Sequence, residues 1–138
     1  MATLINVATP GPALAAATGT NTTIKASATD SAGGVSMITA GTYYNLNSIS
    51  LTAGTWAVFG EMTTGYTTGT ITPALSGTTA SGTNLAPVQT EAGGTTQGNT
   101  EYIGAVIKVA GTTTVYLNGT ASIAASTGYG TIFAIQIA

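Results

Sequence analysis

The feature that most limits the fold of this chain is an alternation of apolar and polar side chains with a period of two residues. Successive side chains of a β-strand point to opposite faces, whereas an amphipathic helix repeats its apolar positions about every 3.6 residues. In 55–63 the alternation places on one face Trp56, Val58, Gly60 and Met62. No segment shows a convincing helical period, and 13–18 is long enough for one turn of helix at most. The pattern therefore predicts an all-β chain.

Turns that contain Gly, Asn or Ser separate the segments that we predict to be strands. These segments are Thr22–Ala28, Val35–Thr39, Tyr43–Leu51, Thr55–Thr63, Thr67–Thr72, Leu85–Thr90, Tyr102–Ala110, Thr112–Leu117, Thr120–Ala125 and Tyr129–Ile137. We expect a tight hairpin at Ala53-Gly54 and a clearer one at Asn118-Gly119, because both positions of an Asn-Gly turn accept a positive φ. Apart from one short strand, 73–99 is predicted to be loop. About eight to ten short strands in one domain predict a single antiparallel jelly-roll sandwich.

The last third of the chain carries the same alternation. In 102–110 one face holds Ile103, Ala105, Ile107 and Val109, and the other holds Tyr102, Val106 and Lys108. In 129–137 one face holds Tyr129, Thr131, Phe133, Ile135 and Ile137. If the Phe133 ring is in the core, Phe133→Ala should cost about 3–5 kcal/mol. Because 55–63 is apolar on both faces, with Phe59 opposite Trp56, we expect that strand to be covered on two sides.

Residues 1–20 are predicted to form an extended N-terminal arm, and 21–138 the jelly-roll domain. Pro10, Gly11 and Pro12 prevent regular structure in the middle of the arm. We expect the arm to dock on a capsid or other partner through its apolar side chains, which are Leu4, Ile5, Val7 and Leu14. A frayed terminus is the alternative. We expect no signal peptide, because the N-terminus lacks a basic region followed by a proper apolar region. We also expect no membrane partner, because polar residues interrupt the apolar stretches well before the ~20 residues of a membrane span.

The chain is poor in charge. Its six formally charged residues are Lys25, Asp30, Glu61, Glu91, Glu101 and Lys108. Disordered chains combine low hydrophobicity with high net charge, whereas this one has 43% hydrophobic residues and a net charge of -2. Charge depletion is instead typical of buried interface cores, so the composition suits a chain that buries much of its surface against copies of itself.

The composition also removes most catalytic and binding chemistry. The absence of His, Cys and Arg excludes Ser-His-Asp and Cys-His catalysis and nearly all zinc sites. Glu91 and Glu101 flank Gly93-Gly94 and could approach each other as a glycosidase pair does, although two solvated loop carboxylates are the simpler interpretation. A Ca²⁺ site at Asp30 lacks Asp-x-Asp-x-Asp spacing. Two lysines are too few for the roughly six to ten phosphate contacts of a nucleic-acid-binding protein. We expect that the chain is not an enzyme and that it has no cofactor and no nucleic-acid partner.

Two stretches of the chain carry a recognisable pattern. The first is Ile49-Ser-Leu-Thr-Ala-Gly-Thr-Trp-Ala-Val-Phe-Gly-Glu-Met62, in which an apolar alternation is followed by Ala-Gly-x-Trp and Val-x-Gly. The second is Thr113-Thr-Val-Tyr-Leu-Asn-Gly-Thr-Ala-Ser-Ile123 followed by Tyr129-Gly-Thr-Ile-Phe-Ala-Ile135. Together they resemble the small trimeric jelly-roll domains of bacteriophage tail fibres and virion surface proteins, over 42–137. Phage capsid decoration (cement) proteins are similar to the chain in size and in trimeric jelly-roll form.

The resemblance implies a homotrimer in a phage virion, bound to the major capsid protein or another virion protein. A lone domain without coiled-coil heptads or shaft repeats favours a capsid decoration or cement protein. A tail-fibre or receptor-binding tip is the alternative, and a bacterial surface or pilus-like adhesin is a third. We interpret most aromatic residues as core or intersubunit packing. In the tail-fibre alternative, Tyr66 and Tyr129 are the exposed tyrosines expected to stack on host glycans.

Overall fold

The structure is a computed structural model that describes residues 24–26, 34–65, 69–92, 100–124 and 126–138. These residues form strands and connecting loops without a helix, so the predicted all-β class is confirmed. The strands are β1 (Ile24–Ala26), β2 (Val35–Met37), β3 (Tyr44–Leu51), β4 (Gly54–Thr64), β5 (Ile71–Ser76), β6 (Gln89–Ala92), β7 (Thr100–Val109), β8 (Thr113–Ala121) and β9 (Ser126–Gln136). The predicted arm, 1–20, lies outside the described residues.

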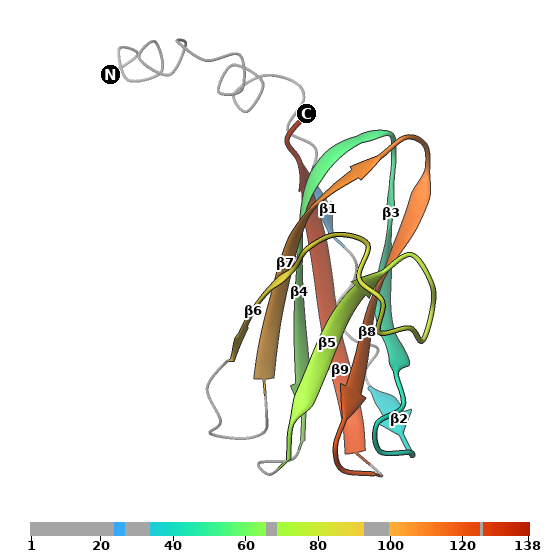
Figure 1. The fold of residues 1–138 in the computed structure, drawn as a ribbon, viewed down its shortest axis with the longest axis vertical. Coiled ribbons are helices and arrows are strands. Elements are labelled where there is room, and N and C mark those ends of the chain that lie inside the picture. Colours follow the sequence, from blue (N-terminus) through green and yellow to red (C-terminus); the bar gives the residue numbers. More distant parts are fainter. Residues whose placement is uncertain (1–23, 27–33, 66–68, 93–99, 125) are drawn as a thin grey trace, which may run out of the picture.

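The strands form two antiparallel sheets that lie face to face (Figure 1). The larger sheet has the order β1-β9-β4-β7-β6, with β2 also paired to β9, and the smaller sheet has the order β3-β8-β5. β1 and β2 share one edge of β9, because β1 pairs at Ile24↔Ile135 and β2 pairs at Val35↔Gly128. The long central strands β4 and β9 pair along most of their length and form the middle of the larger sheet.

The core lies between the two sheets and is centred on Trp56 of β4. Trp56 is completely buried, and its indole Nε1 donates a hydrogen bond of 2.9 Å to the carbonyl oxygen of Thr52. Leu75 of β5 and Leu117 of β8 face it from the smaller sheet and are also completely buried. The face of 55–63 that carries Trp56 is buried, and in β7 so are Ile103, Ile107 and Val109. Alternation therefore grouped the residues of both strands by face correctly, and the structure shows which face enters the core.

The two sheets approach each other closely where Gly130 of β9 meets β3. A Cβ atom added at Gly130 would lie 2.6 Å from the Cβ of Leu46, which is closer than real side chains come. The Asn47 Nδ2 donates a 2.8 Å hydrogen bond to the Gly130 carbonyl oxygen at the same place. A residue without a side chain is needed here because the backbones of two sheets are in near contact.

Both predicted hairpins are wrong. Ala53-Gly54 connects β3 to β4, but these strands belong to different sheets and do not pair, so the turn crosses from one sheet to the other. Asn118-Gly119 lies inside β8, which continues through it and pairs with β3 on one side and β5 on the other. The backbone at Gly119 does not have the positive φ that the predicted turn requires.

The Asn118 side chain explains why an Asn-Gly pair occurs within a strand. It is completely buried, and its Nδ2 donates to the carbonyl oxygens of Thr78 at 2.8 Å and Ser81 at 2.9 Å. Its Oδ1 accepts a 3.1 Å hydrogen bond from the backbone N–H of Ala80, which has a φ of 52. Asn118 thus holds the loop after β5 against the outer side of the smaller sheet.

The predicted loop at 73–99 also needs correction at its start. β5 runs from Ile71 to Ser76, so Pro73 and the three residues after it are strand. β5 is an edge strand that pairs only with β8. A proline is tolerated there because an edge strand leaves one side of its backbone without a ladder partner.

Candidate functional site

The surface that stands out is the side of the larger sheet that faces away from the core, which we call the outer face. It is formed by alternate residues of the three central strands, which are Ala57, Phe59, Glu61 and Thr63 of β4, Tyr102, Gly104, Val106 and Lys108 of β7, and Tyr129, Thr131, Phe133 and Ile135 of β9. Of the seven large hydrophobic side chains exposed in the described part of the chain, four lie here, namely Phe59, Tyr102, Val106 and Phe133. A monomeric protein seldom gathers its exposed apolar groups on one face.

Two stacked aromatic rings lie at the centre of the outer face. The centroids of Phe59 and Phe133 are 5.1 Å apart, and the ring planes make an angle of 24°. The two residues are register partners on β4 and β9, and they remain 41% and 40% exposed. The Phe133 ring is therefore not in the core, and the cost of about 3–5 kcal/mol expected for a core ring does not apply to Phe133→Ala. The face of β9 that enters the core is the opposite one, with Ile132 and Ala134 completely buried.

A row of aliphatic side chains lies beside the aromatic pair. The register joins Ala57 of β4 to Val106 of β7 and to Ile135 of β9. Val106 is 59% exposed, and the contact of an apolar side chain with water is unfavourable. The two adjacent rows together make a continuous apolar strip across the middle of the sheet.

A hollow of about 500 Å³ borders this strip between β4, β7 and the segment that leads into β6. Its lining consists of Ala57, Phe59, Pro87, Gln89, Gly104, Ala105 and Val106. Gly104 is the register partner of both Phe59 and Gln89, and it leaves the space beside the Phe59 ring open. No formally charged residue lines the hollow, so it suits an apolar partner.

The two charged residues of the outer face lie at opposite ends of the apolar strip. Lys108 is paired in register with Thr55, beyond the aliphatic row. Glu61 is paired with Tyr102 and with Thr131, beyond the aromatic row. Both charged side chains are exposed, so covering the apolar strip would leave them at its rim in contact with water.

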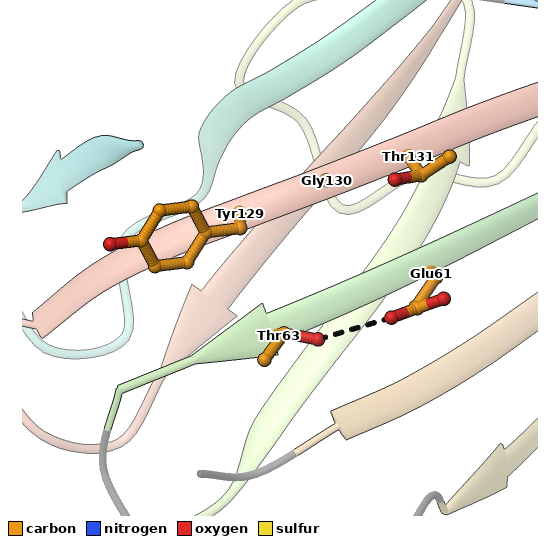
Figure 2. Close-up of a pocket in the computed structure, with 5 residues that line it drawn as sticks. All are labelled: Glu61, Thr63, Tyr129, Gly130 and Thr131. Carbon is orange, nitrogen blue, oxygen red and sulfur yellow. Dashed lines mark hydrogen bonds between the residues drawn. The ribbon is translucent and has the colours of Figure 1, made fainter. Parts of the chain in front are cut away.

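A second hollow, of about 370 Å³, lies at the Glu61 end of the outer face. Its lining is polar apart from one ring and consists of Glu61, Thr63, Tyr129, Gly130 and Thr131. Figure 2 shows the Tyr129 ring at one end and the carboxylate of Glu61 near the other, with Thr63 Oγ1 donating to Glu61 Oε1 at 3.4 Å. An aromatic ring beside a carboxylate and hydroxyls can contact a sugar by stacking and hydrogen bonding.

The structure describes only some of the residues that we considered from the sequence as binding or catalytic residues. Leu4, Ile5, Val7 and Leu14 of the arm lie outside the described residues, as do Tyr66 and Asp30, whose spacing did not support a calcium site. Tyr129 is half-buried and lines the polar hollow. The backbone register pairs Glu91 with Tyr102 and Ala92 with Glu101, so Glu91 and Glu101 are not directly opposite each other.

Two further findings concern the described residues alone. They contain no group of three or more His, Cys, Asp or Glu side chains placed to hold a metal ion. They also contain no helix long and apolar enough to cross a membrane.

The sequence did not single out the four exposed apolar residues of the outer face as a site. The signal was present, because apolar groups on both faces of 55–63 led us to expect a strand covered on two sides. One side is covered by the smaller sheet, and the other is open in the single chain. Comparison with models of protein families, with curated proteins and with solved structures finds no match.

Proposed function

We propose that the chain is a structural protein of a bacteriophage virion, a homotrimeric capsid decoration or cement protein that reinforces the head. The observation that carries this proposal is the apolar outer face of the larger sheet, exposed in a chain that has six formally charged residues in 138. Such a surface suits permanent docking through apolar and backbone contacts better than electrostatically steered, reversible binding. The resemblance of 42–137 to jelly-roll domains of phage tail fibres and virion surface proteins supports a place in the virion, and the lone domain without heptads or shaft repeats favours the head over the tail.

We also propose that the sandwich is a jelly roll, in which nested pairs of strands alternate between two sheets. β9 pairs with β1 and β2 in the larger sheet, β8 with β3 in the smaller sheet, and β7 with β4 in the larger sheet again. These three nested pairs support the jelly-roll topology. The innermost pair departs from it, because β6 joins β7 instead of β5.

The copy number of the chain in purified particles tests the proposed role. A decoration protein is expected in hundreds of copies over the head lattice, with the major capsid protein as its partner. A few dozen copies confined to the tail would contradict the proposal. Deleting residues 1–12 tests the arm separately, since the arm proposal predicts an intact trimer that no longer binds capsids.

A tail-fibre or receptor-binding tip is the second candidate, and the polar hollow around Tyr129 favours it. In that case Tyr129→Ala should reduce adsorption of the particle to host cells, because the ring would no longer stack on a surface glycan. Thr114→Ala, on β8 of the other sheet, is the matched control. Unchanged adsorption in the Tyr129 variant would count against this candidate.

The proposed role is structural and involves no catalysis. A screen against bacterial surface polysaccharides is expected to show no hydrolysis. Turnover that Glu91→Gln abolishes would contradict this part of the proposal, because it would show that a carboxylate of the chain acts on a glycosidic bond.

A further inference from the structure

We infer that the outer face of the larger sheet is the surface that a neighbouring copy of this chain covers in the assembled homotrimer. The inference deepens the proposed function, since it rests on the homotrimer proposed there. Its centre is the stacked pair of Phe59 and Phe133 together with Val106. These are large apolar groups that a folded chain would bury if it had a second layer to place over them.

The size of the outer face is sufficient for such a contact. The three central strands have 11, 10 and 11 residues, and β1 and β6 add short edges of 3 and 4 residues. With strands about 4.8 Å apart and about 3.3 Å per residue, the sheet covers roughly 600 Å², and the protruding side chains add further surface area. A stable interface needs roughly 600–1,000 Å² from each partner. The outer face therefore reaches that range.

The distribution of charge on the outer face favours a copy of the chain as the occupant. Burying a charge without a partner is costly, and Glu61 and Lys108, the two charges of this face on the central strands, lie outside the apolar strip. The register places Glu91 of β6 beside Tyr102, which is also outside the strip. A partner of strongly charged chemistry would find no matching groups on the strip. A second copy brings an equally charge-poor surface, because the whole chain has six formally charged residues and no Arg or His. In a ring of three copies each face has a neighbour, so none is left exposed.

A thiol substituted for Val106 reports directly on whether this face is covered. The chain has no Cys, so Val106→Cys introduces the only thiol, and the change is small at a side chain that is 59% exposed. Ile38→Cys is the matched control, because Ile38 is 69% exposed and follows β2, which pairs with the start of β9 and lies outside the apolar strip. Both full-length variants are treated with a maleimide dye at micromolar protein concentration, and the molar mass of each sample is measured by light scattering.

The inference predicts a trimer in which Cys labelling at position 106 is at least 10-fold slower than at position 38. A trimer with equal rates would overturn it, because the copies would then meet through another surface. A monomer with a slow rate at position 106 would also overturn it, since another part of the same chain would be the cover. A monomer with fast labelling at both positions would refute the contact altogether.

These outcomes are independent of the virion test. Protection at position 106 in a trimer that is absent from phage heads would contradict the proposed function and leave the self-contact in place. A chain that is abundant in heads but freely labelled at position 106 would support the proposed function and contradict the self-contact.

Discussion

Asn118 illustrates how one buried side chain can organise a loop that contributes no strand. Three backbone groups of 78–81 depend on its amide. Asn118→Ala would remove three hydrogen bonds, each of which contributes about 0.5–1.5 kcal/mol net, and water replaces part of the loss because Thr78 and Ala80 are exposed. We expect a loss of about 2–4 kcal/mol in the free energy of unfolding, measured by urea denaturation. Asn45→Ala is the control, because Asn45 is the register partner of Asn118 on β3 and is exposed. Equal effects of the two changes would contradict this role.

Ile132 and Phe133 are adjacent residues that test which face of β9 belongs to the core. Ile132 is completely buried, so Ile132→Ala should lower the free energy of unfolding by about 2–5 kcal/mol. Phe133 is 40% exposed, and its ring stacks on Phe59, so Phe133→Ala should cost only about 1–2 kcal/mol in the separated chain. Chemical denaturation at a protein concentration low enough to avoid association measures both. A larger loss for Phe133→Ala would reverse the assignment of the faces.

At the scale of the strands, Gly130 sets the distance between β9 and β3. A Cβ atom there would meet the Leu46 Cβ at 2.6 Å, so Gly130→Ala must displace a strand and should cost about 1–3 kcal/mol. Gly104→Ala on the outer face is the matched control. Its new Cβ would lie 3.5 Å from the Phe59 ring, an ordinary contact, and we expect no loss of stability. Thermal unfolding of the two variants compares them, and equal melting temperatures would be inconsistent with a close approach of the sheets at Gly130.

Alternation predicted the strands well because it depends only on neighbouring residues. The inner faces of β4 and β7 follow the sequence pattern residue by residue. The turns failed because their chemistry depends on distant partners. Asn118-Gly119 has the composition of a hairpin, but β8 pairs on both sides through it, and the Asn118 side chain binds the loop after β5. Gly54 connects two sheets, and nothing near it in the sequence distinguishes such a crossing from a hairpin.

The candidate site was only partly predictable for a related reason. A strand that is apolar on both faces does not indicate which face meets its own second sheet, so the exposure of Phe133 could not be inferred from β9 alone. Tyr129 was identified from its place beside Gly130, and it does line the polar hollow. The hollow beside Phe59 depends on Gly104 of another strand, which only the register reveals.

At the scale of the whole molecule, the outer face should control association. Val106→Lys places a charge in the middle of the apolar strip, where a covered ammonium group would lose its hydration. We expect this variant to remain folded, since Val106 is exposed in the single chain, and to sediment as a monomer. Ile38→Lys makes the same chemical change at another exposed position and should sediment like the unmodified chain. Sedimentation velocity distinguishes them, and a Val106→Lys trimer would be incompatible with the proposed interface.

The central claim is that this chain acts as an assembly of copies, and the molar mass in solution tests it most directly. Light scattering of the purified, unmodified chain at micromolar concentration should give three times the chain mass of 13.5 kDa. That result is expected because the apolar strip of the outer face gains more from a neighbouring copy than from water. A mass of 13.5 kDa at the same concentration would contradict the account, since the outer face would then be stable while exposed to solvent.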